Sequence, residues 1–204
     1  MITLTELQTD AVCELLNVGM GQATKSLSEM VGEEVLLAVP SAVVVTRRLA
    51  IDRIRQVAGD PVTAVSESFS GPFSGEAILI FPEKQSLRLV QAMLGFGDLP
   101  IENLSEMEQE ALVELGNIVL NACLSSLANI FSQEMHCEVP VFVQGPCEVV
   151  LDDHETADQE DMLLWQMDFS LERLNIEGYL TLLMDVESVE EFSARIQQWL
   201  GEVI

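Results

Sequence analysis

A glutamate and an asparagine three residues apart occur at equivalent places in the two halves of this 204-residue chain. Glu14 and Asn17 stand in the first half, and Glu114 and Asn117 stand 100 positions later. An amide does not titrate near neutral pH, but its donor and acceptor can hold a water molecule in one orientation. Phosphoryl transfer to water suits such a pair, because its catalysis rests on alignment and electrostatics. The glutamate would then be a docking charge for a partner's Lys or Arg.

A third acidic residue precedes each pair by one helical turn. On a helical wheel, Asp10 falls on the same narrow face as Glu14 and Asn17, opposite the apolar face, and Glu110 takes the same place in the second half. Asn121 extends the second stripe by one turn. For a single helix, a solvated surface is the usual explanation of such a stripe. Asparagine is a mediocre helix former, so its repetition at one point of both halves favours a functional role.

The elements that must carry these residues also repeat. Thr5–Gln8 and Ser105–Glu108 both fit a capping box and predict that a helix begins there in each half. Apolar residues follow at helical spacing, which predicts two long amphipathic helices. Pro40 and Pro140 stand 23 residues after the two asparagines, within β-type segments, where a strand start or edge tolerates proline.

Alternating and β-branched segments, and then a second helix, follow each long helix. We therefore predict an α+β fold in which two pseudo-symmetric α-β(n)-α repeats, about 1–100 and 101–204, form a single domain. The two long helices would pack on a largely antiparallel sheet as a two-layer sandwich. The predicted strands are 35–45, 62–69, 76–81, 139–144, 162–171 and 178–184, and the other predicted helices are 47–58, 83–94 and 186–200.

The charge of the chain excludes some partners. Nine Lys and Arg oppose 34 Asp and Glu, and the formal charge of −25 repels nucleic acid and anionic membranes. No secretory signal is visible after Met1, so we expect a cytoplasmic protein. The Cys and His residues lack metal-ligand spacing, and we expect no metal and no cofactor of the chain's own. Seven basic residues precede position 101, which predicts less repulsion of an anionic partner at Asn17 than at Asn117.

The motif resembles that of a known family. The pattern acid or Ser, three residues, Glu, two residues, Asn, then 22 residues to Pro is similar to the active-site motif of the CheC/CheX/FliY family of chemotaxis phosphatases. The first half meets it at Asp10, Glu14, Asn17 and Pro40. In the second half Glu110 stands where the family usually has Asp or Ser, while Glu114, Asn117 and Pro140 match.

The resemblance implies an activity. Members of this family remove phosphate from the aspartyl-phosphate of a CheY-type response regulator. By carry-over, Asn17 and Asn117 would align the hydrolytic water, and Glu14 and Glu114 would pair with the regulator's active-site lysine. The Mg²⁺ would belong to the regulator. Having two sites, the chain resembles the CheC members.

Two other classes of function remain open from the sequence. One is a binding-only module that sequesters the phosphorylated regulator or a partner such as a CheD-like protein. The intact Glu and Asn residues in both halves argue against it weakly. The other is a metal-dependent hydrolase, which would need His or Asp residues at ligand spacing that the sequence lacks.

Overall fold

The computed structural model describes residues 5–32, 34–95, 104–151, 161–171, 174–184 and 186–203. The first half contains α1 (Glu6–Val31), β1 (Val35–Thr46), α2 (Arg47–Ala58), β2 (Val62–Ser70), β3 (Gly75–Pro82) and α3 (Glu83–Leu94). The second contains α4 (Glu106–Phe131), β4 (His136–Cys137), β5 (Val141–Gly145), α5 (Cys147–Val150), β6 (Asp161–Leu171), β7 (Leu174–Met184) and α6 (Val186–Val203). The predicted order of elements is confirmed. The short elements α5 and β4 were not predicted.

Both predicted capping boxes start their helices. The Gln8 amide donates to Thr5 Oγ1 at 3.2 Å, and the Thr5 amide donates to Gln8 Oε1 at 2.8 Å. At the start of α4, the Ser105 amide donates to Glu108 Oε2 at 2.6 Å. These bonds satisfy amides that have no partner within the helix. The capping signals therefore fix where both long helices begin.

The strands form one seven-stranded sheet in the order β1-β6-β7-β3-β2-β4, with β5 also paired to β2, and every pairing is antiparallel. The halves meet where β3 pairs with β7 at the centre of this order. Strand β1 of the first half pairs with β6 of the second, and β5 of the second half pairs with β2 of the first. Strands β1 and β5, which occupy equivalent places in the two repeats, thus each pair with a strand of the other half.

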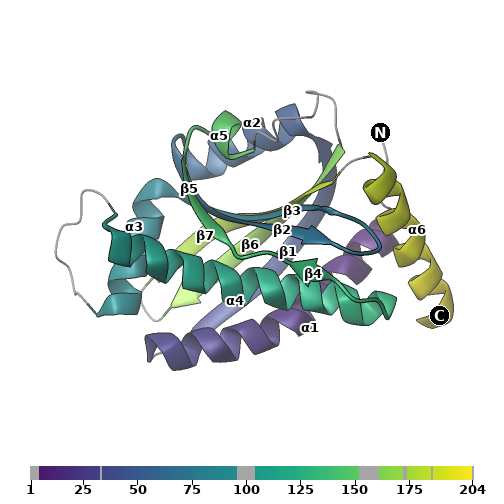
Figure 1. The fold of residues 1–204 in the computed structure, drawn as a ribbon, viewed down its shortest axis with the longest axis horizontal. Coiled ribbons are helices and arrows are strands. Elements are labelled where there is room, and N and C mark those ends of the chain that lie inside the picture. Colours follow the sequence, from purple (N-terminus) through teal and green to yellow (C-terminus); the bar gives the residue numbers. More distant parts are fainter. Residues whose placement is uncertain are drawn as a thin grey trace.

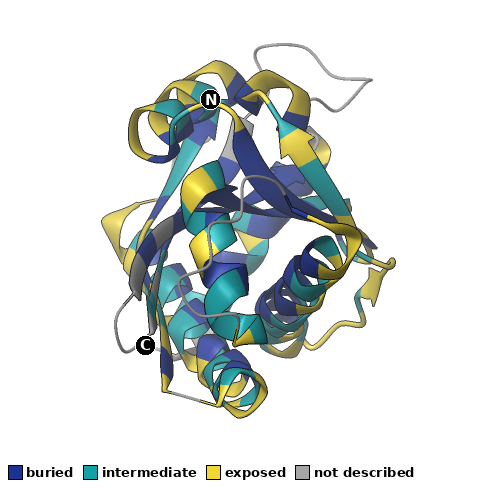
Figure 2. Ribbon diagram, turned by 90° about the vertical axis from the view of Figure 1, so that its left-hand side faces the viewer, coloured by how far each residue is buried: buried dark blue, intermediate teal, exposed yellow. Residues whose placement is uncertain are grey.

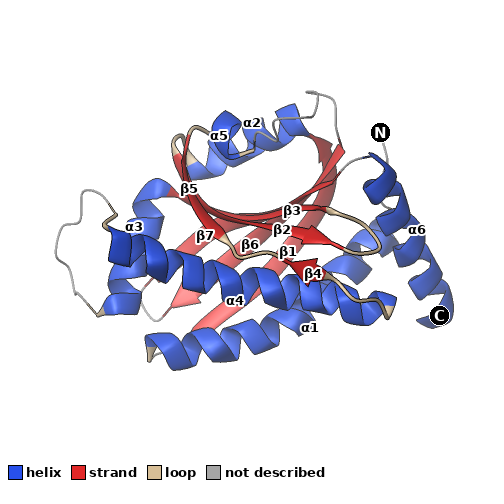
Figure 3. Cartoon of the chain, viewed as in Figure 1, coloured by secondary structure: helices blue, strands red, loops and turns tan. Residues whose placement is uncertain are grey.

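The helices cover the two faces of the sheet unequally. Helices α1 and α4 lie side by side on one face, and α2 and α5 lie on the other (Figure 1). Figure 3 shows the strands between these two sets of helices. The α+β sandwich with two long helices on an antiparallel sheet is confirmed, and α2 and α5 add a partial third layer. Since the motif residues are on α1 and α4, the larger helical layer carries the candidate site.

Each face of the sheet has its own hydrophobic core. The larger core joins the sheet to the layer of α1 and α4 and includes Leu16, Leu120 and Trp165. The smaller one lies toward α2 and α5 and includes Ile54 and Ile78. Figure 2 shows buried residues concentrated on the strands and on the helix faces turned toward them. The polar stripes of α1 and α4 therefore lie on a rigid, well-packed support.

The apolar composition of helix α4 is explained by its burial in the core of the fold. Among the described residues it alone is long and apolar enough to cross a membrane, by length and composition. Ten of its residues are buried inside the fold, and eight apolar ones among them, from Leu112 to Phe131, belong to the larger core. Its hydropathy is thus that of a core helix.

One acidic side chain is buried beneath this layer. Glu67 on β2 is 1% exposed, and neither carboxylate oxygen has a conventional hydrogen-bond partner among the described residues. Burial raises the pKa of Glu67 above its ordinary value of 4.5, and the Cys137 thiol, which contacts the carboxyl, opposes the rise in part. The protein must therefore either keep this carboxyl protonated or bury a charge.

We expect Glu67→Gln to stabilise the protein increasingly as the pH rises. Because the folded pKa is raised, the native state holds the proton longer than the unfolded chain, and stability falls as pH increases above the ordinary glutamate pKa. The gain should be larger at pH 8 than at pH 5, because the glutamine keeps a buried polar group but carries no charge that must be buried. Urea unfolding at pH 5 and pH 8 measures it, with the exposed Glu29→Gln as the control. An equal effect at both pH values would contradict the expectation.

Candidate functional site

The predicted polar stripe lies on the outer side of α1. Asp10 and Glu14 are exposed, and Asn17 is half-buried. The buried apolar residues of α1 lie on the opposite side and belong to the core: Val12, Leu16, Met20, Ala23 and Leu27. The sequence pattern therefore placed the acids correctly on the solvent side, with the asparagine at the boundary between surface and core.

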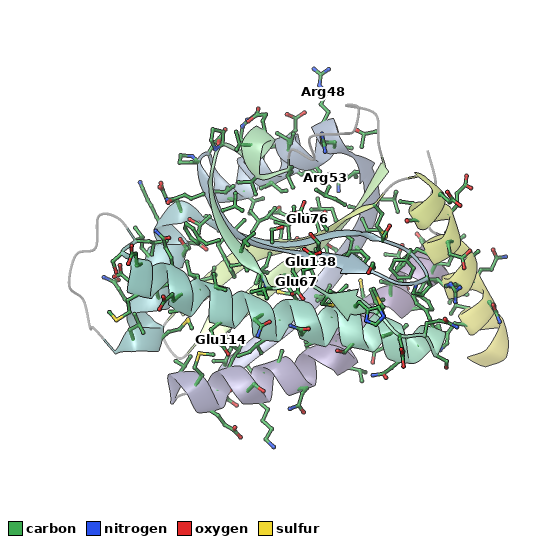
Figure 4. All side chains as sticks on the ribbon, in the orientation of Figure 1. Arg48, Arg53, Glu67, Glu76, Glu114 and Glu138 are labelled. Atoms are coloured by element: carbon green, nitrogen blue, oxygen red, sulfur yellow. The ribbon has the colours of Figure 1, made fainter. Side chains whose placement is uncertain are left out.

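The corresponding stripe lies on α4. Glu110 and Glu114 are exposed and Asn117 is half-buried, which repeats the pattern of α1. Figure 4 shows Glu114 at α4, on the side of the molecule where α1 lies. The two stripes thus occupy the same layer, each presenting two carboxylates and one amide.

The side chain of Asn17 is paired with the backbone of β1. Val39 N–H donates to Asn17 Oδ1 at 2.8 Å, and Asn17 Nδ2 donates to the Val39 carbonyl at 3.2 Å. The ladder between β1 and β6 shifts register between Ala38 and Ser41, so Val39 and Pro40 lack a partner on β6. The amide of Asn17 therefore replaces the missing strand neighbour and satisfies both polar groups of Val39, which is 1% exposed.

This pairing explains the fixed distance between Asn17 and Pro40. Proline has no N–H to donate to a ladder, and it forces the residue before it into an extended conformation. The residue before Pro40 is the one whose backbone pairs with Asn17. Val39 was not predicted from the sequence. The repeated 23-residue spacing from the asparagine to the proline could have indicated it, because Val39 directly precedes Pro40.

The second asparagine is held differently. Asn121 Nδ2 donates to Asn117 Oδ1 at 2.8 Å and to the Asn117 carbonyl at 2.9 Å. Pro140 lies just before β5 rather than inside a strand, and Val139 is 84% exposed. Within the described ranges, no hydrogen bond joins Asn117 to Val139. The two halves share their motif and differ in how the asparagine is fixed.

Helices α1 and α4 approach each other closely beside these sites. A Cβ added to Gly19 would lie 1.7 Å from Ser126 Oγ, which itself donates to the Ala122 carbonyl at 2.6 Å. A groove of about 430 Å³ runs along the contact, lined by uncharged residues of both helices, among them Asn121 and Gln22. A partner that reaches either asparagine meets this neutral strip beside the acidic stripes.

A second close approach fixes α4 against the sheet directly before Asn117. A Cβ on Gly116 would lie 2.4 Å from Val65 Cγ1 and 2.6 Å from Val65 Cβ, and Val65 is buried on β2. By contrast, a Cβ added to Gly21 on α1 would have no atom within 4 Å, and Gly21 is exposed. Gly116 is therefore required by packing, as Gly19 is, whereas Gly21 is not.

We expect Gly116→Ala to destabilise the fold and Gly21→Ala to stabilise it. Overpacking against Val65 should cost about 1–3 kcal/mol, more than the helix propensity gained from alanine. At Gly21 the propensity gain of about 1 kcal/mol stands alone. Urea unfolding of the two variants measures the difference. Equal stabilisation by both would mean that α4 can move away from β2 at no cost.

The basic residues of the first half do not gather around Asn17. Four of the seven, Arg47, Arg48, Arg53 and Arg55, belong to α2, on the opposite face of the sheet from α1. Figure 4 shows Arg48 and Arg53 on that side, away from Glu114. Arg55 is already paired with Asp60 at 2.9 Å and with Glu148 at 2.5 Å. The charge count of each half therefore does not rank the two sites by itself, and lower repulsion at Asn17 stays a prediction that depends on the exposed Lys25 of α1.

The described side chains offer no place for a metal ion. No three His, Cys, Asp or Glu side chains of that part of the chain come together as ligands. The chemistry available at the two stripes is therefore that of carboxylates and amides: charge pairing and the orientation of a water molecule.

Two curated relatives resemble the chain in sequence. The CheY-P phosphatase CheC of Bacillus subtilis is 28% identical over 142 residues, covering 67% of this chain and 66% of that protein. The flagellar motor switch phosphatase FliY of the same organism is 24% identical over 138 residues, covering 67% of this chain and 35% of that protein. The match therefore spans less than two thirds of either relative. No protein-family model matches the chain.

Solved structures share the fold. FliY of Thermotoga maritima superposes with a TM-score of 0.76 at 18% identity, covering 97% of this chain and 100% of that one. The FliM middle domain from H. pylori superposes with a TM-score of 0.68 at 13% identity, covering 94% and 99%. At these identities the likeness concerns the architecture alone.

Proposed function

We propose, from the premise that this chain belongs to the CheC/CheX/FliY family of chemotaxis phosphatases, that it hydrolyses the aspartyl-phosphate of a CheY-type response regulator. The observation that carries the proposal is the repeated stripe. Two exposed acids precede a half-buried asparagine on α1 and again on α4, and the oxygen of each asparagine accepts an N–H hydrogen bond of 2.8 Å. A surface stripe selected for solubility would need no fixed amide.

The reaction requires little of the protein's own chemistry. Water attacks the phosphorus, the aspartate carboxylate leaves, and inorganic phosphate is released. Since an acyl phosphate is already labile, holding the water in line is a sufficient contribution. Asn17 and Asn117 are the proposed catalytic residues, because each still has unused donor and acceptor capacity after its observed bonds.

The glutamates have a separate role in this proposal. Glu14 and Glu114 stand one turn before each asparagine, exposed, and would pair with the regulator's active-site lysine. Asp10 and Glu110 begin the stripe, and Pro40 and Pro140 are supporting motif positions. Mg²⁺, bound by the regulator, would neutralise charge on the phosphoryl group, and this chain would use no cofactor of its own.

A cytoplasmic location follows from this proposal, because the regulator would be met there. We propose neither a nucleic acid nor a membrane as a partner, given the formal charge of −25. A CheD-like protein remains a proposed second partner.

The second candidate function is a binding module without catalysis. The likeness to FliM favours it, because FliM from H. pylori, which shares this architecture, has been solved in a complex with FliG. Such a module would bind the phosphorylated regulator and leave its phosphate in place.

Phosphate release from phosphorylated receiver domains separates the two functions. With this protein present in substoichiometric amount, a phosphatase turns over repeatedly and releases phosphate from the whole regulator pool. A binding module changes the rate only in proportion to the complex formed, or slows it. The absence of acceleration with every CheY-type receiver tested would reject the catalytic proposal.

A further inference from the structure

The two asparagines share one hydrogen-bond arrangement that comes from different donors. In the first half the donor to Asn17 Oδ1 is the backbone N–H of Val39, and in the second half the donor to Asn117 Oδ1 is the side chain of Asn121. Both donor–acceptor distances are 2.8 Å. Both halves therefore hold the side-chain amide of their asparagine in place, but they use different hydrogen-bond donors to do so.

Asn121 has no counterpart in the first half. The position equivalent to Asn121 is Gly21, which has no side chain and faces open space. With Val39 holding Asn17, the first site needs no residue there. With Val139 84% exposed and unbonded to Asn117 within the described ranges, the second site does.

We propose that Asn121 is the positioning residue of the second site, an inference that rests on the proposed phosphatase function. Its Nδ2 group bridges the side-chain oxygen and the backbone carbonyl of Asn117, so it fixes the amide plane relative to the helix. One lone pair of Asn117 Oδ1 and the Asn117 Nδ2 group then remain for the water and the regulator. Val39, through its backbone, has the same role toward Asn17.

Helix stability alone does not account for Asn121. Asparagine is a poorer helix former than alanine, so its presence within α4 weakens the helix in propensity. Asn121 also borders the groove between α1 and α4, where a docked partner would shield its bond to Asn117 from water. Shielding strengthens such a bond, which makes it more useful in the complex than in the free protein.

The test uses an Asn17→Ala background, in which the second site alone remains. There, Asn121→Ala should lower kcat about five- to tenfold, the worth of one orienting hydrogen bond, with the KM for the phosphorylated regulator unchanged. Asn121→Asp is isosteric but cannot donate, so it should turn the Asn117 amide over and lower kcat further. Asn121→Gln keeps the donor and should restore part of kcat.

The matched control is Gly21→Asn in an Asn117→Ala background, which should leave kcat unchanged because the two bonds with the Val39 backbone already fix the plane of the Asn17 amide. Full kcat in Asn121→Ala, or equal kcat in the Asp and Gln variants, would overturn the assignment. Asn17→Ala/Asn117→Ala serves as the reference: if it remains fully active, the proposed function fails. If it is inactive while Asn121→Ala is fully active, only the positioning role fails.

Discussion

Replacing both Asn17 and Asn117 by alanine should reduce dephosphorylation of the regulator to the rate of the regulator alone. Each single variant should keep activity, because the other stripe on the opposite long helix still presents an amide. Loss of a preorganised polar group from a reaction site costs about 10²- to 10³-fold in rate, so the double variant should fall by that order. Phosphate release at saturating regulator measures it.

The structure changes how the Asn17→Ala result must be controlled. An exposed asparagine could be removed from a helix without loss of stability, but Asn17 satisfies the N–H and carbonyl of buried Val39. Its removal should cost about 1–3 kcal/mol through unsatisfied backbone groups. Activity is therefore to be measured well below the unfolding temperature, beside the exposed amide variant Gln197→Ala of α6 as a control outside the groove. A folded double variant with full activity would remove the catalytic assignment.

Changing both Glu14 and Glu114 to glutamine should act on binding instead. If these carboxylates pair with the regulator's lysine, their neutralisation should raise KM about tenfold, within the range found for charge pairs at interfaces. The saturated rate should change much less, because the asparagines and the Mg²⁺ of the regulator remain. Binding of the regulator to this variant, measured beside kcat, separates the two effects.

The opposite pattern would assign a different role to the glutamates. A large fall in kcat at unchanged affinity would mean that a carboxylate takes part in the chemical step. Glu29→Gln combined with Glu106→Gln, two exposed glutamates of α1 and α4 outside the stripes, provides the control for the loss of two negative charges.

Local signals in the sequence were sufficient for the elements and for the faces of the long helices. The hydroxyl of Thr5 and the amide of Gln8 fix a helix start through contacts only three residues apart, and the 3.6-residue period alone places Glu14 opposite Leu16. Such information is local, and it survives in a single sequence. One polar stripe alone would have been explained by solvation, and its repetition 100 residues later is what favoured a functional role.

Non-local partners could not be obtained in the same way. Nothing near Asn17 indicates that Val39, 22 residues away, will lose its strand neighbour at a register shift and accept the amide instead. Nothing in the count of basic residues indicates that four of them share α2 on the far face. The repeat itself misled here, because identical motif residues suggested identical surroundings, while Asn117 relies on Asn121 and Asn17 on a strand.

The exchange of β1 and β5 between the halves bears on the history and the integrity of the chain. A single repeat would leave β1 or β5 without the strand that it pairs with, and we infer that an ancestral half-length protein would have required a second copy, intertwined as a homodimer. Joining the copies made one folding unit, we infer, that cannot be divided near residue 100 into two autonomous pieces. Once the two copies were parts of one chain, their sites could diverge in sequence. Gly21 can therefore occupy the position in the first half that is equivalent to Asn121 in the second.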